Sequence, residues 1–126
     1  MSRKINSKDL SVAIVKTLNE YSEATAEKIK IAVKEAGKTV KKEIESTAPE
    51  DTGAYRKSWR VKTVSETSNS IEVIVHSKNK YQLSHLLEHG HAKRNGGKVP
   101  GTPHIAPAEE KGIEQLEKDI EKILKG

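Results

Sequence analysis

Apolar and small residues recur at intervals of three or four along the first third of the chain. Between Leu10 and Ile44 they occupy positions 10, 14, 18, 21, 25, 29, 33, 36, 40 and 44, which is the repeat of an α-helix. Ser7 or Asp9 would cap its start, and Ala48-Pro49 would end it, because the residue before a proline disfavours helical geometry. Such a helix spans about 50 Å. We therefore expect it either to break near Gly37 or to project onto another subunit.

The middle of the chain changes to the two-residue repeat of β-strands. Residues 59–63 and residues 71–75 each alternate apolar or β-branched side chains with polar ones, and a polar stretch covers 65–70. Two such runs joined by a short polar connection predict an antiparallel β-hairpin.

The last part of the chain predicts two helices separated by a loop. Residues 81–88 fit a short helix that Gly90 ends, and residues 91–104 are rich in glycine and proline, so we expect a long loop there. Pro107 suits the first turn of a C-terminal helix, whose apolar face comprises Ile113, Leu116, Ile120 and Ile123. The expected fold is therefore α+β: a long N-terminal helix, a sheet based on an antiparallel β-hairpin, a short helix, a long loop and a C-terminal helix. We expect residues 1–126 to form a single domain.

Composition narrows the class of protein. The 23 basic and 18 acidic side chains nearly cancel to +5, and hydrophobic residues make up 33% of the chain. This is enough for a folded protein, but the core would be thin, and thin cores are often supplemented by neighbouring subunits. The absence of cysteine excludes disulfides, thiolate metal sites and cysteine nucleophiles. No apolar run reaches the ~18 residues of a membrane span, so we expect a soluble protein without membrane contact.

Charge gathers in three places that could serve as contact surfaces. A row of lysines follows the first helix at intervals of four, a basic loop carries histidines and no acid over 91–98, and the final helix is acidic. Opposite charges on separate surfaces suit head-to-tail pairing of identical subunits, although each set also fits an ordinary solvated face. The residues are Lys30, Lys34, Lys38 and Lys42 in the row; His89, His91, Lys93, Arg94, Lys98 and His104 in the loop; and Glu114 and Glu117 on the helix.

One short string resembles a catalytic motif. Residues 85–89 read His-Leu-Leu-Glu-His and fit the H-x-x-E-H pattern of a class of zinc peptidases. A catalytic zinc needs a third protein ligand, and a chain of this size has no second lobe with which to form a substrate cleft. We interpret the string as a chance match in a structural segment. We expect no catalytic residue, no metal and no cofactor.

Three segments in order resemble a known protein family. Ala48-Pro49-Glu50-Asp51-Thr52-Gly53, followed by Ser58-Trp59, is similar to the Pro-x-x-Thr-Gly then Ser signature of the tail-completion, or head–tail joining, proteins of long-tailed bacteriophages. Leu87-Glu88-His89-Gly90 resembles the Glu-aromatic-Gly element of that family. Pro103-His104-Ile105-Ala106-Pro107-Ala108 resembles its Pro-aromatic-x-x-Pro-Ala approach to the last helix. The chain departs from the usual pattern at His89 and His104, where an aromatic residue is commoner, and at Tyr55, where leucine is usual.

The resemblance implies a non-enzymatic virion protein of the neck and tail, assembled in the host cytoplasm. It implies a ring of identical subunits, with six expected from tail symmetry. The implied partners are head-completion or connector proteins, tail tube or tail terminator proteins, and the DNA passing through the channel. The motif residues would then be structural: Pro49, Thr52, Gly53, Ser58, Trp59, Glu88, Gly90, Pro103, Pro107 and Ala108. We expect Gly53 either to adopt a positive φ or to lie where a Cβ would collide with a neighbour, and we expect Trp59 to lie in the core. The alternative is a small basic DNA-binding accessory protein, suggested by the pI of about 9.3 and the lysine row.

Overall fold

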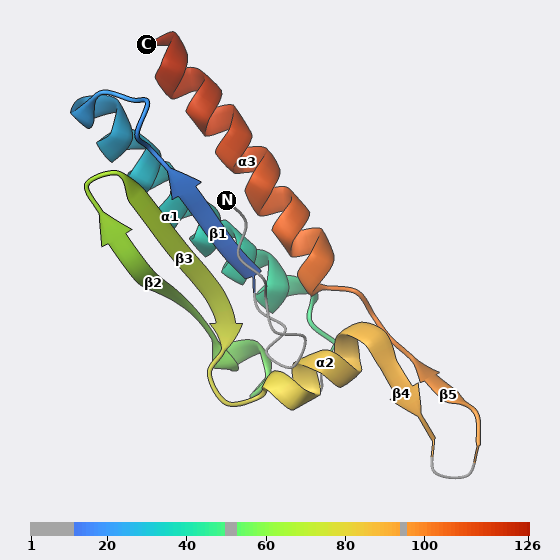
Figure 1. The fold of residues 1–126 in the computed structure, drawn as a ribbon. Helices are drawn as coiled ribbons and strands as arrows, with labels where there is room; N and C mark the ends of the chain where they lie inside the picture. Colours follow the sequence, from blue (N-terminus) through green and yellow to red (C-terminus); the bar gives the residue numbers. More distant parts are fainter. Residues whose placement is uncertain (1–11, 50–52, 94–95) are drawn as a thin grey trace.

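The computed structural model describes residues 12–49, 53–93 and 96–126 (Figure 1). It confirms the α+β class, with a three-stranded antiparallel sheet, two long helices, a short helix and a small second hairpin. In chain order the elements are β1 (Val12–Thr17), α1 (Glu23–Thr47), the 3₁₀ turn η1 (Arg56–Ser58), β2 (Trp59–Thr67), β3 (Ser70–Ser77), α2 (Tyr81–His89), β4 (Gly90–Ala92), β5 (Lys98–Pro100) and α3 (Ile105–Lys125).

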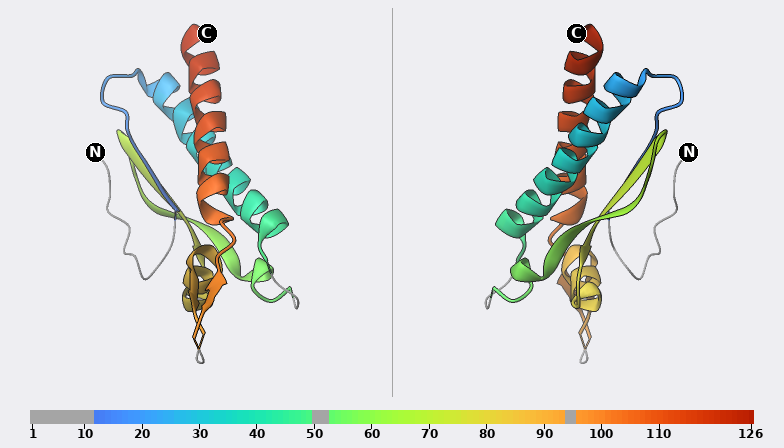
Figure 2. Two further views of the ribbon diagram at one scale, coloured as in Figure 1. Left: turned by 90° about the vertical axis from the view of Figure 1, so that its right-hand side faces the viewer. Right: turned by 90° about the vertical axis from the view of Figure 1, so that its left-hand side faces the viewer.

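The main sheet has the strand order β1-β3-β2, so the predicted hairpin forms its centre and one edge. In β3 every second side chain from Ile71 to Ser77 is buried. These side chains point towards α1, which lies along one face of the sheet, and α3 packs along α1 (Figure 2). The core formed between these layers contains Val33, Val40, Trp59 and Val73, each 0% exposed, which confirms that Trp59 is a core residue. None of the described helices is long and apolar enough to cross a membrane.

The prediction that one helix covers Leu10 to Ile44 is wrong at its start. Residues 12–17 form β1, and α1 begins only at Glu23. A step of four residues is close to one helical turn but is also two strand repeats, so apolar positions 14 and 18 fit both periods. The β-branched content of Val12–Thr17 decides in favour of the strand. The helix cap is Ser22, whose hydroxyl accepts a hydrogen bond from the Thr25 N–H at 3.2 Å.

Of the two alternatives for the long helix, the break near Gly37 is wrong, because the 25-residue helix α1 continues through this glycine. A Cβ at Gly37 would lie 2.9 Å from Val73 Cγ1 and 3.1 Å from Val61 Cγ1. The glycine therefore lets the helix approach the sheet closely. The predicted end of the helix is confirmed, since Thr47 is its last residue and Ala48 is its C-cap.

Two further expectations need correction near the C-terminus. The stretch predicted as a long loop contains the antiparallel strands β4 and β5, paired from Gly90↔Pro100 to Ala92↔Lys98. On α3, Leu116 is buried and Ile120 and Ile123 pack against the core, as predicted. Ile113 instead lies on the outer side of the helix and is 42% exposed.

Candidate functional site

The β4–β5 hairpin projects from the end of the molecule opposite the C-terminus of α3 (Figures 1 and 2). Its residues His91, Lys93 and Lys98 are exposed, and the sequence from 90 to 101 contains no acidic residue. Arg94, predicted as part of the same basic segment, lies outside the described residues. The hairpin is therefore a basic arm, and it brings His91, Lys93 and Lys98 together as the sequence predicted.

Two glycines cross at the base of this hairpin. A Cβ on Gly90 would lie 2.4 Å from the Val99 carbonyl oxygen, and a Cβ on Gly101 would lie 2.4 Å from the Glu88 carbonyl oxygen. Side chains at either position would drive the two backbone segments apart. The Thr102 N–H also donates to the Leu87 carbonyl at 2.7 Å. Backbone packing thus fixes where the arm leaves the body.

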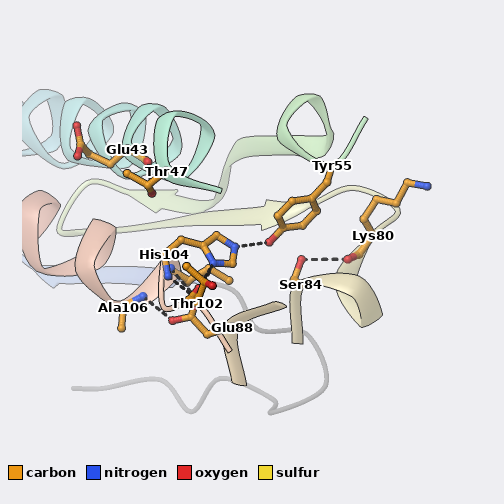
Figure 3. Close-up of polar contacts among 10 residues, drawn as sticks. Glu43, Thr47, Tyr55, Lys80, Ser84, Glu88, Thr102, His104 and Ala106 are labelled. Atoms are coloured by element: carbon orange, nitrogen blue, oxygen red, sulfur yellow. Dashed lines mark hydrogen bonds and ion pairs between the residues drawn. The ribbon is translucent and has the colours of Figure 1, made fainter. Parts of the chain in front are cut away.

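Glu88 joins the arm to the beginning of α3 (Figure 3). Its carboxylate accepts hydrogen bonds from the backbone N–H groups of His104 at 2.7 Å, Ile105 at 2.9 Å and Ala106 at 3.1 Å. The N-cap residue of α3, His104, makes no side-chain capping bond, so the carboxylate from α2 supplies the cap. Burial raises the pKa of Glu88, but the three N–H donors and the neighbouring His104 outweigh burial and leave the pKa below its ordinary value.

His104 is buried at 1% exposure, which corrects its placement in the basic loop. Its Nδ1 lies 2.8 Å from the Thr102 carbonyl and 3.0 Å from Glu88 Oε1. Since both of these are acceptors, we assign the ring proton to Nδ1. Nε2 then accepts a hydrogen bond from the Tyr55 hydroxyl at 2.7 Å. Tyr55, at the start of η1, is 0% exposed. The three side chains form one buried cluster that links η1, α2 and α3.

Most of the motif residues have structural positions. Ser58 is buried and donates to the Tyr55 carbonyl at 2.6 Å, while its hydroxyl also lies 2.8 Å from that of Ser77. Gly53 has φ +83°, as predicted, and Gly90, also at φ +83°, ends α2. Thr52 lies outside the described residues. The remaining motif residues lie around the ends of the two long helices: Pro49 follows α1, Pro103 precedes α3, Pro107 lies in its first turn, and Ala108 is buried on it.

The lysine row on α1 is exposed at Lys38 and Lys42 and buried at Lys30. Lys30 is buried, with its Nζ 3.1 Å from Glu27 and 3.8 Å from Glu66, and Lys34 reaches the other oxygen of Glu66 at 3.2 Å. Lys38 pairs with Glu35 at 3.3 Å. Only Lys42 has no ion pair within the described residues. Most of the row is therefore offset by acids of its own chain, chiefly through Glu66 on the neighbouring strand β2.

The outer side of α3 keeps its acidic character. Glu114 and Glu117 are exposed, as is Glu110, and none of the three forms an ion pair with a described residue. Two large apolar side chains are exposed on the same helix: Ile113, among these glutamates, at 42%, and Leu124, two turns beyond Glu117, at 53%. The structure thus places the predicted acidic residues on one surface and adds an apolar component that the sequence analysis missed.

The glutamate of the H-x-x-E-H string has a structural role. His85 and His89 are exposed with their ring centroids 5.0 Å apart, but the carboxylate between them is occupied at the start of α3. Across the described parts of the chain no three potential metal ligands come together. The string is part of α2, and its glutamate is a helix cap.

Sequence reasoning missed the Tyr55–His104 contact because the two residues are 49 positions apart. One signal was available in the sequence: both residues depart from the pattern of the resembled family. A polar pair that replaces two apolar side chains at separate positions is a sign of contact between them.

Comparison with models of known protein families identifies a related family. A family model described as "Bacteriophage HK97-gp10, putative tail-component" matches residues 13–90, from β1 to the end of α2. No curated protein and no solved structure matches the chain.

Proposed function

The chain belongs to the HK97-gp10-like family of bacteriophage tail components, and from this premise we propose that it completes the tail and joins it to the head. The match over residues 13–90 carries the proposal. It covers the Pro49–Trp59 segment and the Glu88–Gly90 segment, whose buried contacts give both a structural role. As a tail component the protein is a structural part of the virion.

The proposed assembly is a closed ring of identical subunits in the neck, most simply six to match the tail. Contacts in such a ring are head-to-tail and require two different surfaces on each subunit. The exposed basic hairpin and the acidic outer side of α3 support this arrangement, because they lie on separate elements and carry opposite charge.

The proposed neighbours of the ring are a head-completion or connector protein on one side and the tail tube or tail terminator on the other. DNA would pass through the central channel, and the protein would assemble in the host cytoplasm before it enters the virion. No observation on the described residues favours the DNA-accessory alternative. The lysine row that suggested it is largely held in ion pairs with Glu27, Glu35 and Glu66.

A joining assay tests this function. In a phage that lacks the gene, we expect DNA-filled heads and complete-length tails to accumulate separately. Purified protein added to a mixture of the two should restore joined, infectious particles, as counted by electron microscopy and plaque titre. Protein that has been irreversibly unfolded serves as the control. Joined particles in the absence of the protein would refute the role. Duplex binding that weakens steeply with salt, together with normal joining, would favour the DNA-accessory role.

A further inference from the structure

The outer side of α3 has the features of a protein-docking surface. Glu110, Glu114 and Glu117 follow one another at intervals of four and three, so they share one side of the helix. Ile113 and Leu124, both more than 40% exposed, lie next to that row on the helical repeat. Lys111 and Lys125 of the same helix pair with Glu43 and Glu121, and Lys118 is exposed next to Glu117. Exposed apolar side chains beside such a row of carboxylates are typical of a surface that a partner covers.

The charge complement to this surface is present in the same chain. The hairpin carries Lys93 and Lys98 with His91, all exposed and none in an ion pair with a described residue. It cannot reach α3 of its own subunit, because it leaves the N-terminal end of α3 and extends away from the helix (Figures 1 and 2). The two surfaces can therefore meet only between different copies.

We propose that the β4–β5 hairpin of one copy docks across the outer side of α3 of the next copy. This inference rests on the proposed ring and names its two contact surfaces. Exposed ion pairs are individually weak, so the charges would set the orientation, while Ile113 and Leu124 of one copy would be covered by the other. Leu86, 41% exposed on α2 beside the hairpin, offers an apolar counterpart.

The contacts at the base of the hairpin favour its docking onto another copy. The Gly90–Gly101 crossing and the Glu88 carboxylate fix the arm on the body before any partner arrives. Binding then requires little ordering of the arm, which lowers the entropic cost of association.

Cysteine cross-linking tests the contact directly, since the chain contains no cysteine. The variant Lys98→Cys/Glu117→Cys would be produced during infection, and purified particles would be treated with a short bis-maleimide. A head-to-tail contact places the two thiols on different subunits, so we expect a ladder of covalent multimers on a denaturing gel. The matched control is Lys98→Cys/Lys42→Cys, which moves the second thiol to α1 and should give only the monomer. Each single-cysteine variant should give no ladder.

The outcomes separate this inference from the proposed function. Presence of the double variant in joined particles without a ladder would overturn the contact but leave the joining role. Absence of the protein from wild-type particles would overturn the joining role itself. If duplex DNA protected the hairpin from hydrogen exchange and no ladder formed, the hairpin would bind nucleic acid instead, and the proposed contact between subunits would be overturned.

A second pair of variants tests the apolar part of the surface. Ile113→Ser should reduce the ladder at least severalfold in the double-cysteine background, with an unchanged melting temperature, because Ile113 is outside the core. Ile31→Ser is the matched control: Ile31 is 62% exposed, but on α1. Equal ladders from both variants would show that Ile113 is not covered by a neighbouring copy.

Discussion

Glu88 shows how a single buried carboxylate can set the direction of an element. It lies on α2, yet its hydrogen bonds go to the first N–H groups of α3. The chain between Glu88 and α3 forms the β4–β5 hairpin. The Glu88 side chain therefore holds together the two ends of the segment that contains the hairpin. Removal of the charge should loosen α3 and the arm together.

Glu88→Gln should lower the free energy of unfolding by about 1–3 kcal/mol at neutral pH, because charged caps on buried N–H groups are strong hydrogen bonds. The folded-state pKa of Glu88 lies below its unfolded value. Its stabilisation is therefore complete above the unfolded pKa and is lost as the pH falls through the lower folded pKa. The difference between wild type and variant should thus shrink in strong acid.

Urea unfolding at neutral and acidic pH would measure this difference. Glu110→Gln is the matched control, because Glu110 lies near the same end of α3 but is exposed. We expect it to change stability by less than about 0.5 kcal/mol. A Glu88→Gln difference that stays the same at every pH would contradict the assigned role of the carboxylate.

Gly53 gives a second prediction at the residue scale. Its φ of +83° disfavours β-branched residues, whereas a Cβ there would meet no atom within 4 Å. Gly53→Val should therefore cost about 1–3 kcal/mol through backbone strain alone. Gly53→Asn should cost less, since asparagine tolerates this region. Thermal denaturation of both variants would measure these costs. A valine variant with the melting temperature of the wild type would show that the backbone can relax.

At the scale of elements, the packing of α3 on α1 depends on Gly112. A Cβ there would lie 2.4 Å from Val40 Cγ2 and 3.3 Å from the Ala36 carbonyl oxygen. Alanine favours a helix over glycine by about 1 kcal/mol, but this clash involves a stiff β-branched side chain in a closed core. We expect Gly112→Ala to be destabilising by about 1–3 kcal/mol, as overpacked cores usually are.

A double-mutant cycle isolates the clash. Val40→Ala removes the atom that the new methyl group meets, so Gly112→Ala should be far less costly in the Val40→Ala background. Free energies of unfolding from chemical denaturation would give the coupling. Strictly additive effects would mean that the helices shift apart instead.

The elements that the sequence predicted correctly are those with an unambiguous local signal. The β2–β3 hairpin shows a two-residue repeat over 59–63 and 71–75, and the end of α1 is marked by Ala48-Pro49. β1 was missed because its apolar spacing fits a helix as well, and its pairing with β3 is a long-range contact. β4 and β5 were missed because each has three residues, too few to show a period.

The candidate site was predictable only in part for the same reason. The charges of the hairpin and of α3 are visible in the sequence. Whether a charge is free depends on what the fold brings near it, and Glu66, the residue that neutralises Lys34, comes from the neighbouring strand β2. Likewise, Glu88 was noted as a motif residue, but its role as the cap of another helix required the structure.

At the scale of the whole molecule, the two basic surfaces can be compared directly. Lys93→Glu/Lys98→Glu reverses the charge of the exposed hairpin, and we expect it to abolish head–tail joining while circular dichroism and melting temperature stay unchanged. Lys34→Glu/Lys38→Glu reverses two charges that already have partners in their own chain. We expect this variant to lose some stability but to retain joining.

The measurement is the number of joined particles in the complementation assay at matched protein concentration. If Glu114→Lys/Glu117→Lys restored head–tail joining in the background of the hairpin variant, direct pairing of the two surfaces would be supported. Loss of joining in the α1 variant, with normal joining in the hairpin variant, would instead assign the contact to the lysine row.

The strand order β1-β3-β2 also has a consequence for the time course of folding during synthesis. β1 leaves the ribosome first, but its Val12 pairs with Val75, which is made 63 residues later. The β2–β3 hairpin is local and can close as soon as it emerges, whereas β1 must first close a long loop. Its position at the edge of the sheet permits this late addition. Within the three-stranded sheet, β1 is therefore synthesised first and paired last, and until then its apolar side chains can be covered only by α1.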